Sequence, residues 1–78
     1  MRVSLYHVPF FKLERNGCIW ILGYNTRTNQ FVKYSTTNGP GMFQSFDTVE
    51  ELYALYRWFT SKGWTTTYKD VDNIKRYA

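Results

Sequence analysis

The chain has 78 residues, a formal net charge of +4 at pH 7 and an aromatic content of 21%. A chain of this length builds one hydrophobic core, so we expect a single domain over residues 1–78 and exclude two independent cores. Cys18 is the only cysteine, which excludes an internal disulfide, and the first residues lack the apolar stretch of a signal peptide or membrane span. We therefore expect a cytoplasmic protein without membrane contact.

Residues 3–8 are rich in β-forming side chains and predict a first strand. We expect it to end at Pro9, which marks a bend or an edge because proline cannot donate a ladder hydrogen bond. Residues 10–14 and 18–24 predict two more strands. Between them lies the pair Asn16-Gly17, which supplies the positive φ angles of a tight hairpin turn.

The chain after this hairpin extends the sheet. Five polar residues at positions 25–29 separate the hairpin from a β-rich run at residues 30–35, which predicts an antiparallel meander. Residues 36–41 contain two glycines and a proline and predict a flexible, irregular loop. Residues 42–46 are then expected to re-enter the sheet.

A helix is predicted next, and Thr48 and Glu51 mark its start. The threonine can cap the amide three residues on while Glu51 reaches back, and Asp47 with Glu50 offers an equivalent cap. The helix should end near residue 61 or 62, because Gly63 can adopt the left-handed conformation that closes a helix.

The C-terminal part predicts one more strand and a short helical turn. Residues 64–69 alternate as a strand does, and residues 70–74 can form a final turn whose negative end suits Lys75 and Arg76. We therefore expect an α+β domain. Its mostly antiparallel sheet, a β-meander plus a C-terminal strand, carries one amphipathic helix packed on one face.

Helical periodicity separates a core stripe from one exposed tryptophan. The stripe consists of Val49, Leu52, Tyr56 and Phe59, flanked by Tyr53 and Leu55. Trp58 points almost opposite, toward solvent. Since tryptophan leads the residues that dominate interface energetics, we expect Trp58 to contact a partner. The alternative is that the C-terminal strand or tail folds over it.

The predicted sheet has two faces. Pairing of Arg15 with Cys18 places Phe11, Leu13, Trp20 and Leu22 on the face that seats the helix, and pairing across the second turn adds Val32 and Tyr34. The other face is then expected to hold Ile19, Ile21 and Phe31, bordered by Lys12 and Lys33. An apolar centre with a polar rim is typical of a protein-binding surface. A register error of one residue would exchange the faces.

Residues for catalysis are sparse. His7 is the only histidine and Cys18 the only thiol, and neither metal-ligand spacing nor a phosphate-binding loop is present. We therefore expect no enzyme activity, catalytic residue, cofactor or metal.

Two alternative functions remain open. Residues 31–34 match the tail of the aromatic strand motif of RNA-recognition domains, so Phe31 and Lys33 could bind single-stranded nucleic acid by stacking and charge. The basic residues are dispersed along the chain, which is more typical of a solvated surface. A homo-oligomer, such as a dimer that covers the open sheet face, is the second alternative.

A short meander, residues 45–52 opening a helix, and Gly63-Trp64 entering a last strand together carry a resemblance over residues 18–69. In this succession the chain resembles small phage-encoded host-takeover proteins, including some anti-CRISPR proteins. The resemblance implies a compact, non-enzymatic protein that occupies the surface of a larger host machine in the host cytoplasm.

The leading expectation is a protein-binding module that sterically blocks a host protein or nucleic-acid-processing complex. The residues expected to carry the binding are Trp58, Arg57, Ile19, Ile21, Phe31, Lys12 and Lys33. Aromatic and aliphatic side chains would supply buried area, and the cations would orient the partner.

Overall fold

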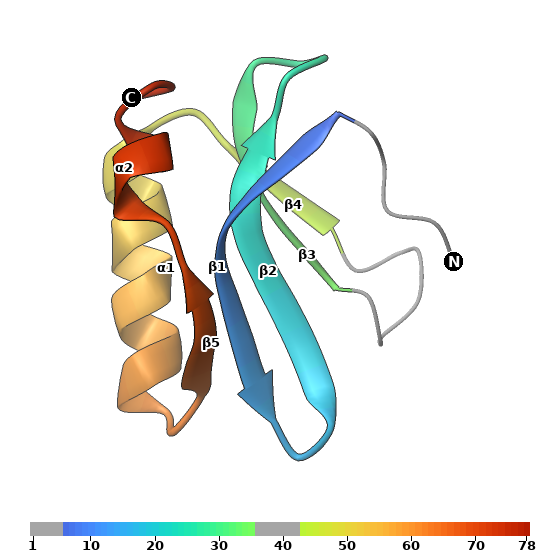
Figure 1. The fold of residues 1–78 in the computed structure, drawn as a ribbon, viewed down its shortest axis with the longest axis vertical. Helices are drawn as coiled ribbons and strands as arrows, with labels where there is room; N and C mark the ends of the chain where they lie inside the picture. The colour runs from blue at the N-terminus through green and yellow to red at the C-terminus, as the bar shows by residue number, and fades with distance from the viewer. Residues whose placement is uncertain (1–5, 36–42) are drawn as a thin grey trace.

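Five strands and two helices make up the part of the chain that the computed structural model describes, residues 6–35 and 43–78. In chain order they are β1 (His7–Arg15), β2 (Cys18–Asn25), β3 (Gln30–Ser35), β4 (Phe43–Phe46), α1 (Val49–Ser61), β5 (Thr65–Lys69) and α2 (Val71–Ile74). The strands form one antiparallel sheet in the order β4-β3-β2-β1-β5, with α1 against one face (Figure 1). The predicted α+β fold is confirmed. The loop predicted at residues 36–41 lies outside the described residues.

The first hairpin forms as the sequence predicts. Arg15 pairs with Cys18, and the two residues between them have positive φ angles, 52° at Asn16 and 79° at Gly17. These angles match the right-handed twist of the flanking strands, which is why an Asn-Gly pair favours a two-residue turn.

The predicted strand end at Pro9 is wrong, because β1 runs through it, whereas the predicted bend is present as a β-bulge. The register of β1 on β2 shifts between Pro9 and Phe11, so that Phe10 is the extra residue of a bulge. Proline is tolerated at a bulge because regular ladder pairing is interrupted there. Opposite the bulge, a side chain at Gly23 would run into the carbonyl of Val8. The predicted strands at 3–8 and 10–14 are therefore one strand from residue 7, and residues 3–5 lie outside the described ranges.

The second turn has four residues rather than five, because Asn25 still belongs to β2 and pairs with Gln30. The side-chain Oδ1 of Asn25 accepts hydrogen bonds from the backbone amides of Arg27 at 2.9 Å and Thr28 at 3.3 Å. Asn29 closes the turn with a φ of 58°. An even number of turn residues shifts the register of β3 by one relative to the prediction.

The two sheet faces therefore differ from the prediction on β3. Phe31 and Lys33 lie on the same face as Leu22, under the helix, whereas Val32 and Tyr34 share the opposite face with Ile21. On β1 and β2 the prediction is confirmed, since the helix-side core contains Phe11, Leu13, Trp20 and Leu22.

The predicted capping box begins α1. Thr48 accepts from the amide of Glu51, and Oε2 of Glu51 accepts from the backbone amides of Thr48 and Asp47. At the other end Gly63 has a φ of 89°, as the sequence predicts. Arg15 Nη1 also donates to the carbonyl of Lys62 at 2.9 Å, which ties the tip of the first hairpin to the end of the helix.

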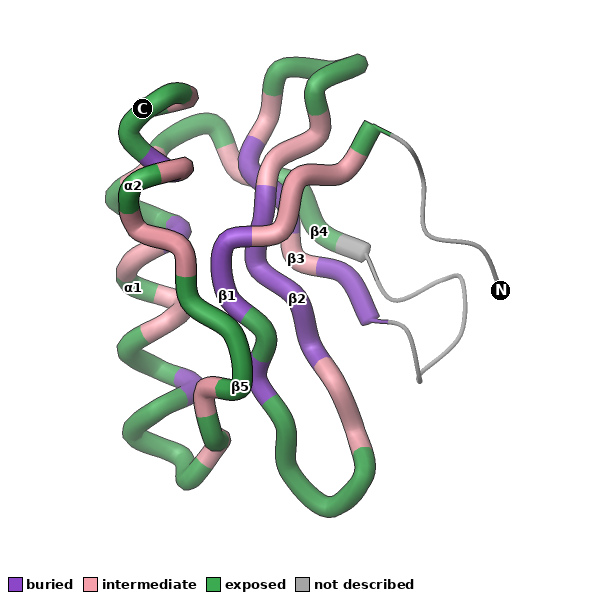
Figure 2. Tube along the Cα trace, in the orientation of Figure 1, coloured by how far each residue is buried: buried purple, intermediate pink, exposed green. Residues whose placement is uncertain are grey.

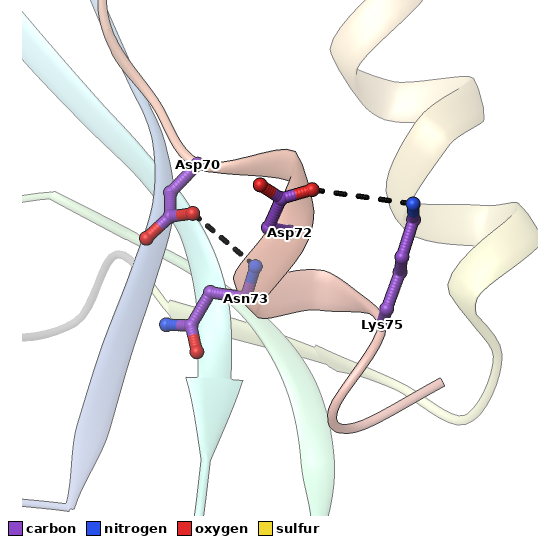
Figure 3. Close-up of polar contacts among 4 residues, drawn as sticks. All are labelled: Asp70, Asp72, Asn73 and Lys75. Atoms are coloured by element: carbon purple, nitrogen blue, oxygen red, sulfur yellow. Dashed lines mark hydrogen bonds and ion pairs between the residues drawn. The ribbon is translucent and has the colours of Figure 1, made fainter.

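The last helix, α2, is a single short turn at the end of the sheet. Asp70 Oδ1 accepts from the amide of Asn73 at 3.2 Å, and an exposed ion pair of 4.0 Å joins Asp72 to Lys75 (Figure 3). Ile74 is buried, and Tyr77 stacks on Tyr24 with ring centroids 4.5 Å apart. The short C-terminal turn therefore closes one end of the core.

Most of the core lies between the sheet and α1. Buried residues run along the middle of β1 and β2, whereas α1 is buried only where it meets the sheet (Figure 2). From α1 the buried side chains are Leu52 and Phe59. The other side of the helix faces solvent.

Candidate functional site

An open groove of about 580 Å³ lies between the exposed side of α1 and the strands β3 and β4. Its lining is mostly apolar and consists of Lys33, Gln44, Phe46, Glu51, Ala54, Leu55, Trp58 and Phe59. The groove exists because α1 crosses the sheet close to β4, a four-residue edge strand. Concave, mostly apolar surfaces with a few polar groups are where proteins most often bind other molecules.

Trp58 forms one wall of the groove and is 51% exposed. Its exposure confirms the position that helical periodicity predicts. The indole lies edge-on to Phe59 with ring centroids 5.3 Å apart, and Phe59 in turn contacts Trp20 and Trp64. A rigid base of core aromatics therefore holds a tryptophan at the surface, as in the anchor residues of interfaces.

Two lysines sit on aromatic rings at the groove. The Nζ atom of Lys33 lies 4.6 Å from the ring centroid of Trp20, and the Nζ atom of Lys62 lies 5.9 Å from that of Trp58. Lys33 was predicted on the face opposite the helix, and the register of β3 places it in the groove instead. Both ammonium groups add positive charge at the rim of the groove.

The outer side of α1 continues the groove wall. Glu50, Ala54, Arg57 and Trp58 are all exposed there. Neither Glu50 nor Arg57 makes an ion pair within the described part of the chain. The carboxylate of Glu51, by contrast, is held by the capping box.

The second predicted surface, Ile19, Ile21 and Phe31 with a lysine rim, does not form. Phe31 is 5% exposed and packs under the helix against Phe10 and Tyr24, because of the four-residue turn. Ile21 is 4% exposed, and Ile19 is partly buried against the same small cluster. Lys12 remains on that side, and its Nζ atom lies 5.7 Å from the ring centroid of Tyr68. Lys12 and Lys33 thus lie on opposite faces.

His7 and Tyr34 form a stacked pair that the sequence did not indicate. Their ring centroids are 4.5 Å apart with the planes at 24°. Burial lowers the pKa of His7 below its usual 6.5 and raises the pKa of Tyr34 to about 12, because it disfavours the charged form of each ring.

Sequence reasoning selected Trp58 and Lys33, although it placed Lys33 on the wrong face of the sheet, and it missed the other residues that line the groove. Gln44, Phe46, Ala54 and Leu55 line it together only because β4 and α1 meet in space. The nearest signal in the sequence is the spacing of Ala54, which lies one turn before Trp58 on the same side of the helix.

The described residues hold no cluster of three or more His, Cys, Asp or Glu side chains that could bind a metal ion. None of the helices within the described ranges has the length and apolar character needed to cross a membrane. Comparisons of the chain with protein-family models, with curated proteins and with solved structures found no match. Its function must therefore be argued from the groove.

Proposed function

We propose that this protein is a non-enzymatic binding module that docks on another protein through the groove between α1 and β3–β4. The observation that carries the proposal is Trp58, which is 51% exposed at the wall of an apolar groove and rests on core aromatics. A half-exposed indole on a rigid base leaves little conformational entropy to lose on binding. It can bury much of its area, about 150–250 Å² for an aromatic side chain, against a partner.

Charge assists the docking in this proposal. Lys33 and Lys62 lie at the groove, and Arg57 is exposed beside it on α1. Cations at the rim of an interface orient the partner and raise the rate of association, while the apolar centre supplies the affinity. The partner surface that fits best carries acidic residues around an apolar recess.

The proposed mode of action is steric. A domain of 78 residues that covers a functional surface of a host protein or nucleic-acid-processing complex blocks it without any chemistry of its own. The resemblance to phage-encoded host-takeover proteins suggests this mode of action, which is part of what we propose.

Nucleic-acid binding has less support. Phe31, on which that alternative rested, has no exposed ring to stack on a base. The large aromatics that are exposed within residues 6–35 and 43–78 are Tyr6, Trp58 and Tyr68, and they lie on separate parts of the fold. A single strand that stacks on successive rings needs those rings along one groove.

Affinity capture from a host lysate tests the proposal, with tagged wild type, Trp58→Ala and Tyr68→Ala compared with and without nuclease. We expect wild type and Tyr68→Ala to retain the same protein in stoichiometric amounts after nuclease. Trp58→Ala should lose at least about 2 kcal/mol of binding, roughly 30-fold, as a truncated anchor does. Its free energy of unfolding should fall by only about 1 kcal/mol, because the half-exposed indole loses mainly its cation–π contact with Lys62.

The control is matched, since Tyr68 is an aromatic that is 40% exposed on β5, away from the groove. Equal capture by Trp58→Ala and wild type would overturn the proposal. Retention that disappears with nuclease would favour nucleic-acid binding, and it should then weaken steeply with salt.

A further inference from the structure

The charges on the exposed side of α1 are arranged symmetrically about Ala54. Glu50 lies four residues before Ala54 and Arg57 three after it, so the three lie on one side of the helix. A neighbouring row within α1 reads Glu51, Ala54 and Trp58, and Asp47 and Lys62 lie just before and just after the helix. Each row is acidic before Ala54 and basic or aromatic after it.

Such a row is complementary in charge to the same row of a second copy when the two helices are antiparallel. A two-fold axis beside Ala54 places Glu50 of one copy opposite Arg57 of the other, and the reverse contact forms at the same time. A parallel arrangement would instead set Glu50 against Glu50, which repels.

The groove supplies the matching apolar contact. In the antiparallel arrangement Trp58 of the second copy lies opposite Glu51, which lines the groove together with Leu55 and Phe46. A volume of about 580 Å³ accommodates an indole, and Lys33 on β3 also lines the groove. The small side chain of Ala54 allows the two helices to approach closely at the centre.

From this self-complementarity we propose that the partner of the groove in the free protein is a second copy of this chain. The two α1 helices pack antiparallel, and each Trp58 enters the groove of the other copy. The proposal rests on the proposed function in one respect, that the groove is a protein-binding surface. In a complex with a target, the target replaces the second copy.

The size of the contact makes this dimer a weak one. Helix α1 has 13 residues and is therefore about 20 Å long. One helix face and a groove bury an area at the low end of specific interfaces, below about 1,200 Å² in total, where complexes are transient. The dimer should therefore form only as concentration rises from micromolar to millimolar.

Sedimentation equilibrium over that range is the test. Wild type and the matched control Tyr68→Ala should shift from monomer to dimer mass at the same concentration. Trp58→Ala should stay monomeric. Ala54→Glu should also stay monomeric, because it sets two carboxylates face to face at the axis while Ala54 itself is exposed and tolerates the change. Circular dichroism confirms that each variant is folded.

Charge reversal at Glu50 and Arg57 distinguishes this arrangement from any other dimer. Arg57→Glu places a carboxylate opposite Glu50 of the second copy at two symmetric positions and should weaken the dimer by roughly tenfold. The double variant Glu50→Arg/Arg57→Glu restores opposite charges at both positions and should regain dimerisation. A variant with Lys69→Glu, on β5, carries the same change in net charge and should dimerise as wild type does.

Three results would overturn the inference: a wild type that remains monomeric at millimolar concentration, a dimer insensitive to both Trp58→Ala and Ala54→Glu, or a double variant that does not recover. A monomer that still captures a protein through Trp58 overturns the self-pairing alone. A dimer with the expected sensitivities that captures no protein after nuclease overturns the proposed function alone.

Discussion

His7 and Tyr34 lie on the face of the sheet away from α1, where their rings stack with centroids 4.5 Å apart. Burial lowers the pKa of the imidazole below 6.5, since it disfavours the protonated form. A neutral ring packs flat on Tyr34 without the cost of a buried charge. The pair therefore couples the protonation of one side chain to the stability of the fold.

We expect the free energy of unfolding to fall as pH decreases from about 7 to about 5. Well above pH 6.5 His7 is neutral in both states, whereas near and below pH 6.5 the unfolded chain takes up a proton that the folded chain resists. Urea unfolding at several pH values measures the fall. In His7→Gln, whose side chain cannot titrate, the free energy of unfolding should fall less over the same pH range. An equal fall in both proteins would contradict the assignment to His7.

Helix α1 is the element on which both proposals depend, and its start is determined locally. Thr48 and Glu51 satisfy orphan amides at the first turn, and the acidic side chains of the first turn suit the positive end of the helix dipole. This geometry sets where the helix begins and hence which side Trp58 occupies, ten residues later. A cap at the N-terminus thus contributes to the position of the candidate site.

Thr48→Ala should reduce the free energy of unfolding by about 0.5–2 kcal/mol, because it leaves the amide of Glu51 without its acceptor. Thr60→Ala is the matched control. Its hydroxyl only donates to the carbonyl of Arg57 within the helix, so its loss should change stability by about 0.5 kcal/mol or less. Chemical denaturation of both variants measures the difference, and equal losses would show that the capping box contributes nothing specific.

At the scale of the whole molecule, α2 closes the core that the sheet and α1 leave open at one end. Ile74 is 1% exposed within the helix-side core, and Tyr77 packs on Tyr24 and Phe10. The amide of Asp70 also donates to the carbonyl of Phe10 at 2.9 Å, which joins the end of β5 to the bulge of β1. A short C-terminal segment therefore completes a small core.

Ile74→Ala should cost about 2–5 kcal/mol of stability, because it opens a cavity in a fully buried position. In a domain whose total stability is of order 5–15 kcal/mol this is a large share. Lys75→Ala is the neighbouring control, since it removes only an exposed ion pair of 4.0 Å and should cost about 1 kcal/mol or less. Similar denaturation midpoints for the two variants would place Ile74 outside the cooperative core.

The sequence predicted the kind and order of the elements well and their contacts less well. Both hairpin strands around Asn16-Gly17, the capped helix and the last strand are where residue patterns place them. The prediction at Pro9 failed because the effect of a proline on a strand depends on whether a bulge accommodates it. Here the bulge requires Gly23 on the opposite strand. Of the predicted binding residues, Trp58 and Arg57 are exposed on α1, whereas Phe31 lies on the face of the sheet opposite to Ile19 and Ile21.

By itself the sequence determined the first hairpin turn, the helix caps and the side of α1 that carries Trp58, because each depends on residues within about one turn of one another. Only the tertiary structure decided which face of the sheet holds Phe31 and Lys33, since one residue, Asn25, belongs to β2 rather than to the turn and reverses every side chain of β3. It also decided that the helix meets β4 to form the groove. No local sequence pattern predicts this contact between α1 and β4, because it depends on how the whole core packs.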